Sequence, residues 1–224
     1  MKNAAKKVSA VLLTAVLLLV VASAAAFVRL DIRTKALHDD IDSVMNDKNY
    51  RTAVGAEEVK VITQQVSCGY AVIEMFSRYS GGEITEQKLY DTYGKVVTST
   101  GSAFCDEMNR QFDGFDTAMY RYLPDSELLK KVHESLEAGV PVPFEWAAKT
   151  DDEWTLHYSL ITGMDLFQNR ITVANPYGYT ENITAEELLE RTSFEAYEDM
   201  PLLLRFGFAF GIFEKNTVFI PVRK

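Results

Sequence analysis

The sequence contains no run rich in lysine or arginine and no glycine-rich loop of the kind that holds phosphates. Its formal net charge is −9 at pH 7, and setting aside the three positive charges of Lys2, Lys6 and Lys7 leaves −12 on the remainder. An acidic body of this kind repels phosphate backbones. We therefore expect no nucleic-acid partner.

Cysteine is also scarce, since Cys68 and Cys105 are the only two in the sequence. Neither lies near the N-terminal apolar run, which excludes a lipid-modified N-terminal cysteine. Outside the cytoplasm, two cysteines commonly form one disulfide bond. The alternative is one nucleophile and one bystander thiol, and composition alone leaves both interpretations open.

The N-terminal lysines precede an apolar run over residues 8–28, and a basic start followed by such a run directs a chain to a membrane. Small residues at 22–24 are typical of a signal-peptide cleavage site, but about 20 apolar residues also suffice to cross a bilayer. We expect residues 1–28 to be a signal peptide or, with a slight preference, an uncleaved transmembrane anchor. Residues 29–54 then form a polar stalk, and everything after the run is extracytoplasmic, either membrane-anchored or secreted.

The 224 residues, of which 47% are hydrophobic, are enough for one sizeable core and too few for two large domains. Apolar periodicity predicts helices at residues 68–80, 85–93, 101–112 and 124–139. β-Branched and aromatic residues predict extended segments at 59–62, 140–147, 154–164 and 170–174, and a closing antiparallel pair at 205–213 and 217–222. A capping box at 184–187 predicts one more short helix. Helices followed by antiparallel strands indicate an α+β fold.

Cys68 opens a predicted helix, with Ser67 in the N-cap position. Unpaired backbone N–H groups and the helix dipole at that end lower the pKa of a thiol and favour the thiolate. Gly69 is expected to leave room for a substrate backbone. An oxyanion hole needs an amide donor beside a backbone N–H, and Gln64 or Gln65 can supply it next to the N–H of Cys68.

A possible base for this nucleophile is His157, which lies in a predicted strand. Asn175 ends the next strand and begins an Asn-Pro-Tyr-Gly turn. If the two strands form a hairpin, His157 and Asn175 lie at the same end of it, where the amide can accept from the imidazole and fix its tautomer. The remaining histidines, His38 and His133, are expected on the surface.

Taken in order, these motifs resemble those of papain-like cysteine peptidases related to the bacteriocin-leader-processing (double-glycine leader) proteases. The resemblance covers roughly residues 55–180, and it implies a papain-like fold over residues 55–224 with the nucleophile at a helix N-terminus packed on an antiparallel sheet. It further implies hydrolysis of a peptide or protein substrate through a thioester acyl-enzyme. Cys68 is then the nucleophile, His157 the base and Asn175 the orienting residue, with no cofactor or metal.

Two positions depart from the family pattern. The family usually has its oxyanion glutamine about six residues before the cysteine, where this chain has Ile62, and commonly has Asp where this chain has Asn175. Transporter and nucleotide-binding domains are also lacking, so leader processing as part of a pump is not expected. Three other interpretations stay open: an inactive papain-like binding domain, an acyl transferase or amidase with the same triad, and a domain stapled by a Cys68–Cys105 disulfide.

Overall fold

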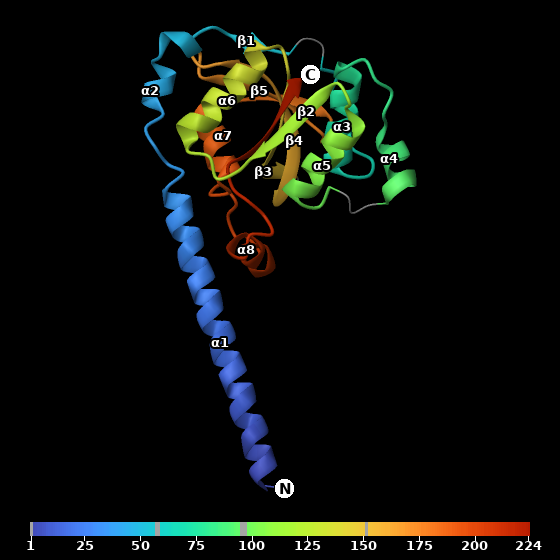
Figure 1. Cartoon of the computed structure of the whole chain (residues 1–224). Coiled ribbons are helices and arrows are strands. Elements are labelled where there is room, and N and C mark those ends of the chain that lie inside the picture. Colours follow the sequence, from blue (N-terminus) through green and yellow to red (C-terminus); the bar gives the residue numbers. More distant parts are fainter. Residues whose placement is uncertain (1, 57–58, 95–97, 151) are drawn as a thin grey trace.

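The computed structural model describes residues 2–56, 59–94, 98–150 and 152–224, and of residues 2–11 only the backbone. Helix α1 (Lys2–Lys35) extends away from the rest of the chain (Figure 1). Within Leu12–Lys35, an 18-residue window has a mean hydropathy of 2.3 and is not buried, so this helix is long and apolar enough to cross a membrane. The side chains of Lys2, Lys6 and Lys7 lie outside the described part.

An antiparallel sheet of seven strands forms the centre of the domain (Figure 1). Its order is β2 (Phe115–Tyr120), β7 (Thr217–Arg223), β3 (Val142–Thr150), β4 (Glu153–Asp165), β5 (Arg170–Asn175) and β6 (Tyr179–Ile183), and β1 (Val54–Gly55) pairs with β4. The predicted strands at 140–147, 154–164 and 170–174 correspond to β3, β4 and β5. The predicted α+β fold is therefore confirmed.

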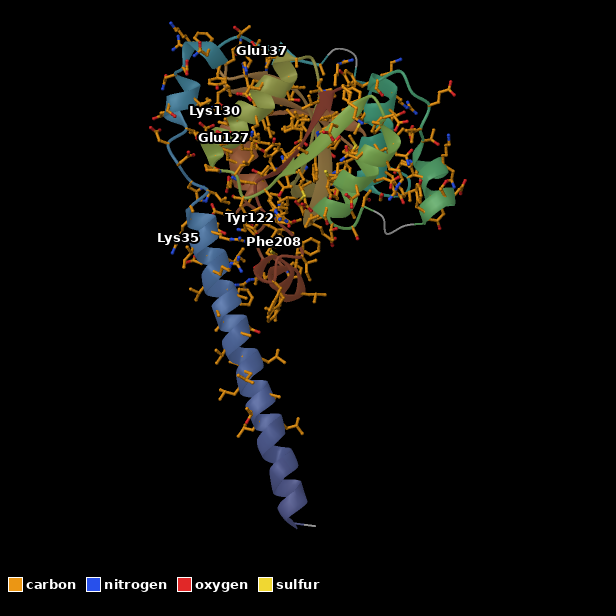
Figure 2. The ribbon with its side chains drawn as sticks, viewed as in Figure 1. Lys35, Tyr122, Glu127, Lys130, Glu137 and Phe208 are labelled. Atoms are coloured by element: carbon orange, nitrogen blue, oxygen red, sulfur yellow. The ribbon has the colours of Figure 1, made fainter. Side chains whose placement is uncertain are left out.

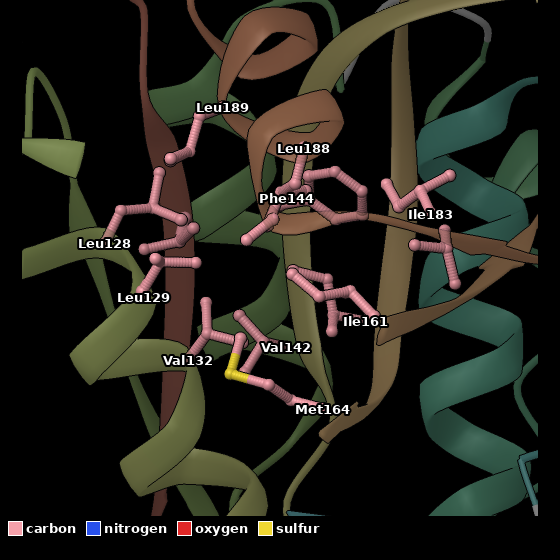
Figure 3. Close-up of a cluster of buried hydrophobic side chains, with 14 of the residues drawn as sticks. Leu128, Leu129, Val132, Val142, Phe144, Ile161, Met164, Ile183, Leu188 and Leu189 are labelled. Atoms are coloured by element: carbon pink, nitrogen blue, oxygen red, sulfur yellow. The ribbon is translucent and has the colours of Figure 1, made fainter. Parts of the chain in front are cut away.

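Helices cover both faces of this sheet because the strands alternate their side chains between two cores. Helices α6 (Asp125–Glu137) and α7 (Ala185–Thr192) pack against one face, where Leu128, Val132, Phe144 and Ile161 are fully buried (Figure 3). On the other face, α3 (Cys68–Tyr79) and α5 (Gly101–Gln111) pack over Tyr158, Leu160 and Phe219, and α4 (Glu86–Tyr93) lies against α3. The helix that begins at Cys68 is thus held against β4, which carries His157.

The predicted closing pair of strands at 205–213 and 217–222 is wrong in its first half. Residues Leu202–Ala209 form helix α8, which begins after Pro201. The partners of β7 are β3 and β2, and the sequence analysis missed β2. A continuous apolar run has no periodicity that separates a helix from a strand. Glycine is required at position 207 of this helix, because a Cβ there would come within 2.5 Å of the Phe213 ring that packs against it.

The polar segment after α1 packs on the domain. It contains the short helix α2 (Asp42–Met45) and the 3-10 turn η1 (Lys48–Tyr50), and Leu37 and Val44 are buried. A carboxylate oxygen of Asp39 accepts the backbone N–H of Ser126 at 2.8 Å, which fixes this segment to the start of α6. The boundary predicted between residues 54 and 55 remains a prediction.

The expected surface position of His133 is wrong. Only 1% of this residue is exposed, and its ring packs edge-on against Tyr50, with the ring centroids 5.1 Å apart. Nε2 lies 3.3 Å from the carbonyl oxygen of Thr52, so the segment before β1 covers it. His38 is partly exposed and hydrogen-bonds Asp125 through Nδ1 at 2.9 Å.

The two cores give a first prediction about stability. We expect Leu129→Ala to lower the free energy of unfolding by about 2–5 kcal/mol, because Leu129 is fully buried in the α6 core and truncation leaves a cavity. Leu203→Ala is the matched control, since Leu203 is 84% exposed, and its effect in detergent micelles should stay below about 0.5 kcal/mol. Urea unfolding curves of the two full-length variants measure this, and equal effects would contradict the described packing.

Candidate active site

The thiol of Cys68 lies at the first turn of α3, as the sequence predicts. Ser67 caps the helix with an extended backbone, and its side chain accepts the N–H of Tyr70 at 3.2 Å. The preceding loop is held by the carboxylate of Glu86, which accepts the N–H groups of Gln65 at 2.7 Å and of Ser67 at 3.1 Å. Glu86 is only 3% exposed, so a buried charge fixes where the helix begins. Sequence reasoning missed this residue, because a lone carboxylate in a helix is normally solvated.

The space beside Gly69 does not serve a substrate, contrary to expectation. A Cβ at this position would lie 2.5 Å from Oγ1 of Thr98, so the Thr98 side chain fills that space. Gly69 is therefore required for packing of the chain against its own helix. Next to it, the hydroxyl of Tyr70 donates to the carbonyl of Gly94 at 2.7 Å, which ties the segment after α4 to the same turn.

Both cysteines are free thiols in this structure, so the disulfide interpretation is not realised here. Cys68 is half-buried, whereas Cys105 is buried and donates to the carbonyl oxygen of Thr117 at 3.3 Å. Cys68 is therefore the more exposed residue of the two, although burial raises the pKa of both thiols.

Pairing of β4 with β5 brings His157 and Asn175 together. Nε2 of His157 lies 3.0 Å from Oδ1 of Asn175, and both residues are buried. The amide orientation is defined by its other partners, because Nδ2 donates to the Glu181 carboxylate at 2.7 Å and Oδ1 accepts the N–H of Tyr177 at 3.0 Å. Oδ1 can only accept, so Nε2 of His157 carries the proton and Nδ1 is the basic nitrogen in the neutral ring.

Glu181 connects this pair to a second layer of contacts. Arg191 approaches Glu181 at 3.2 Å, and its guanidinium lies 3.4 Å from the centre of the Trp146 ring. The Nε of Arg191 also donates to the carbonyl of Ala147 at 2.9 Å. Neither Glu181 nor Arg191 was singled out in the sequence, where both lie in polar segments at a strand and a helix.

The loop before Cys68 and the turn after Asn175 are joined directly. Thr63 pairs with Tyr177 as an antiparallel bridge, and the N–H of Gln64 donates to the carbonyl of Pro176 at 2.7 Å. The ring of Tyr177 in turn stacks on His157 with centroids 4.2 Å apart. All three sequence motifs therefore meet in one place, although they are up to about 110 residues apart in the chain.

The two candidate glutamines differ in their surroundings. Gln65 is exposed and turns its side-chain amide back to the carbonyl of Thr63 at 3.2 Å. Gln64 is half-buried, and its Oε1 is buried without a hydrogen-bond partner among the described residues. Because the Gln65 amide nitrogen already donates to Thr63 and the Gln64 amide lies half-buried next to the Asn175 turn, Gln64 is the better oxyanion candidate.

The structure places Cys68 next to the histidine strand without a direct bond to the ring. Its sulfur interacts with the backbone of Tyr158, the residue after His157. A negative charge on this sulfur would raise the pKa of the Tyr158 and Tyr177 hydroxyls. Within the described residues the sulfur makes no hydrogen bond to the imidazole. Such bonds are often long before substrate binds and tighten in the complex.

Burial sets the protonation states of this pair. It raises the pKa of the Cys68 thiol, although backbone groups of Tyr158 and Gly69 act in the opposite direction. It also lowers the pKa of His157 to about 4, against the raising effect of the Asn175 hydrogen bond. The expected low thiol pKa at a helix N-terminus is therefore outweighed by desolvation. At neutral pH the resting site holds a thiol and a neutral imidazole.

Glu145 is a further buried carboxyl close to the nucleophile. It is fully buried on β3 opposite Tyr158, and neither its oxygens nor the Tyr158 hydroxyl has a partner in the described part of the chain. Burial raises the pKa of Glu145 to about 8, and the charge of Glu214 acts in the same direction. As for metal ligands, no group of three or more His, Cys, Asp or Glu side chains is placed to hold an ion within the described ranges.

A histidine–asparagine pair on a sheet, with a cysteine at the N-terminus of a helix packed on that sheet, is the arrangement expected of a papain-like cysteine peptidase. The comparisons with known proteins agree with this class. A family model described as the Peptidase_C39 like family matches residues 56–200, and the chain belongs to this family. A search of curated proteins gave no match.

Among solved structures, the chain is similar to a double glycine motif protease from an AMS/PCAT transporter, crystallised in complex with the leader peptide. The identity is 17% and the TM-score 0.50, over 76% of this chain and 95% of that one. At this identity the likeness shows the fold, which is the papain-like fold predicted from the sequence.

The buried carboxyl predicts a pH-dependent stability. A glutamate in the unfolded chain ionises near pH 4.5 and Glu145 in the folded chain near pH 8, so folding becomes less favourable as the pH rises between these values. We expect Glu145→Gln to remove this loss, which is on the order of 4 kcal/mol at pH 8 and close to zero at pH 4. Urea unfolding of both proteins at pH 4, 6 and 8 tests it, and parallel pH profiles would contradict the raised pKa.

Proposed function

We propose that this cysteine peptidase hydrolyses peptide bonds with Cys68 as nucleophile, His157 as general base and Asn175 as the residue that orients the base. The observation that carries the proposal is the hydrogen bond from Nε2 of His157 to Oδ1 of Asn175 at 3.0 Å. It leaves Nδ1 unprotonated and available to the thiol. Only this tautomer can accept a proton from a nucleophile on the other side of the ring.

The first half of the reaction begins from a neutral pair. Nδ1 of His157 takes the proton of the Cys68 thiol as the sulfur attacks the peptide carbonyl carbon, and the carbonyl oxygen becomes an oxyanion. The backbone N–H of Cys68 and the side-chain amide of Gln64 stabilise that oxyanion, and Gln65 is the alternative donor. The imidazolium then protonates the leaving amine, and a thioester joins the acyl group to Cys68.

In the second half, water replaces the amine. His157 takes a proton from the water as its oxygen attacks the thioester carbonyl, and the carboxylic acid leaves as the sulfur is reprotonated. Every proton transfer passes through Nδ1, so no metal or cofactor is needed for this route. The same groups would serve an amidase if another amide replaced the peptide bond, or an acyl transferase if another acceptor replaced water.

We propose an extracytoplasmic location with α1 as an uncleaved membrane anchor. The exposed apolar helix supports it, since side chains of α1 project into open space along most of its length (Figure 2). A removed signal peptide would carry the domain to the same side of the membrane. We keep the domain boundaries proposed from the sequence: residues 1–28 as signal peptide or anchor, 29–54 as polar stalk and 55–224 as peptidase domain.

The substrate proposed is a peptide or an unfolded segment of a protein. Support comes from the related protease fold, which was crystallised with a leader peptide bound. No feature of the described site favours one side chain next to the cleaved bond.

Substrate-independent labelling tests the nucleophile. We expect iodoacetamide to modify Cys68 at least about 10-fold faster than Cys105, because Cys105 is buried and Cys68 has a base within reach. His157→Ala should slow labelling of Cys68 and leave that of Cys105 unchanged. Mass spectrometry of peptides after timed labelling gives both rates in one sample. Equal rates, or no effect of His157→Ala, would contradict the assigned pair.

Peptide cleavage tests the activity itself. With a fluorescence-quenched peptide library, we expect Cys68→Ala to reduce turnover by at least about 10³-fold, and Cys105→Ala to retain it. If the wild-type protein labels selectively but cleaves no peptide, an amidase or transferase is favoured; if it binds peptides without labelling, the inactive binding domain is favoured.

A second-layer carboxylate gives a sharper test of the orienting residue. We expect Glu181→Ala to lower kcat by about 10–100-fold with little change in KM, because the Asn175 amide loses the partner that fixes its orientation. Glu181→Gln keeps an acceptor oxygen and should restore most of the activity. Glu187→Ala is the matched control, since Glu187 also contacts Arg191 at 3.2 Å but does not touch Asn175. Similar losses in Glu181→Ala and Glu187→Ala would show that only the arginine matters.

A further inference from the structure

Four large apolar side chains lie exposed on helix α8 and the turn after it. Leu202 is 63% exposed, Leu203 84%, Phe210 53% and Ile212 54%. We call these residues the α8 patch. A groove of about 540 Å³ adjoins them, lined by Leu203, Leu204, Phe210 and neighbouring apolar residues. Monomeric soluble proteins rarely expose apolar side chains gathered in this way.

The α8 patch is held in a fixed position by the opposite side of the helix. Phe208 is only 2% exposed and packs on Phe194 with ring centroids 4.7 Å apart. Phe213 packs against Gly207 from the turn that follows. The exposed side chains therefore belong to an ordered helix whose buried face is already satisfied.

Helix α8 lies directly beside the proposed membrane anchor. Phe206 meets Phe27 of α1 edge-on with ring centroids 5.2 Å apart, and Figure 1 shows α8 projecting from the domain next to α1. Phe27 stands at the domain-proximal end of the apolar run 8–28. A run of 21 helical residues spans about 30 Å, which is the thickness of the hydrocarbon core. Phe27 thus marks the level where that core meets the headgroups.

Basic side chains gather at this level although the protein is acidic. Arg29 and Arg33 on α1 and Arg205 on α8 are exposed, and Arg33 lies 4.7 Å above the ring of Tyr122. Figure 2 shows Tyr122 and Phe208 at the junction between the domain and α1. Cationic side chains just outside an apolar surface match the anionic headgroups of a bilayer.

We propose that the α8 patch inserts into the outer interface of the same bilayer that α1 spans, so that the domain has a second contact with lipid. This rests on α1 being an anchor, as proposed above. Lipid is the occupant that the geometry favours, because the helix that carries the patch touches Phe27 through Phe206 and lies at the same level once α1 is embedded. The apolar side chains then reach about 5–10 Å into the boundary between headgroups and acyl chains.

Two contacts restrain the domain more than a single helix does. The apolar core cluster that contains Phe208 of α8 also includes Trp154 and Leu156 of β4. The residue after Leu156 on that strand is His157. The end of β4 that carries the base is therefore the end held at the membrane. Substrates near the lipid surface would be favoured over those far from it.

Spin labels on the full-length chain in liposomes of phosphatidylcholine and phosphatidylglycerol test this proposal. Labels are introduced by Leu203→Cys in the patch, Leu17→Cys in the anchor and Phe167→Cys as control, each with Cys68→Ser and Cys105→Ser. Phe167 is 70% exposed in the β4–β5 turn, far along the sheet from α8. Collision rates with oxygen, which concentrates in lipid, and with a water-soluble nickel chelate report the surroundings of each label.

We expect the oxygen-to-nickel ratio at Leu203 to exceed that at Phe167 several-fold and to approach that at Leu17. A lipid signal at Leu17 with a water signal at Leu203 would overturn the patch proposal and leave the anchor intact. A water signal at Leu17 would overturn the anchor. If Leu203 is shielded from both reagents and its spectrum narrows on dilution with unlabelled protein, the patch joins two copies of the chain, which also overturns lipid insertion.

Discussion

The site depends on the Asn175 amide having one orientation in a place that water does not reach. Its two ends are similar in shape, and in solvent either end could face the imidazole. Here Nδ2 meets a carboxylate that can only accept, and Oδ1 meets a backbone N–H that can only donate, so the two partners agree. The consequence reaches the next residue, because His157 must then carry its proton on Nε2. The basic nitrogen of the site is therefore selected by Glu181, which touches neither the histidine nor the cysteine in the described contacts.

The burial that fixes these orientations also makes single charges costly. It raises the pKa of Cys68, lowers that of His157 to about 4 and raises that of Glu145 to about 8, so each group is held in its neutral form. A thiolate or an imidazolium alone would carry the full cost of desolvation, whereas the two formed together largely cancel. Because Glu145 is also neutral at physiological pH, its carboxyl places no negative charge near the Cys68 sulfur.

The sequence predicts the parts of the site that have strong local signals. Cys68 follows a serine cap, His157 lies in a run of strand-forming residues, and Asn175 begins an Asn-Pro-Tyr-Gly turn, so each could be placed on its element without knowledge of the fold. Glu86 and His133 could not, since each is buried by a segment distant in sequence. Glu181 could not either, because its contact with Asn175 follows from the pairing of β5 with β6. Tyr50 and Thr52 cover His133 from about 80 residues away, and a polar side chain in an amphipathic helix gives no sign of this.

Helix α8 was missed for a different reason, and that reason is itself informative. A helix at the surface of a soluble domain alternates apolar and polar faces, and this alternation is what sequence patterns detect. In Leu202–Ala209, Arg205 is the only charged residue, so neither face is polar and no period is visible. One apolar face packs against Phe194 and Phe213. Outside that face, Leu202 and Leu203 are exposed, and Phe206 meets Phe27 of the apolar helix α1. The missing period and the exposed patch thus have the same cause, because this helix has apolar surroundings on both sides.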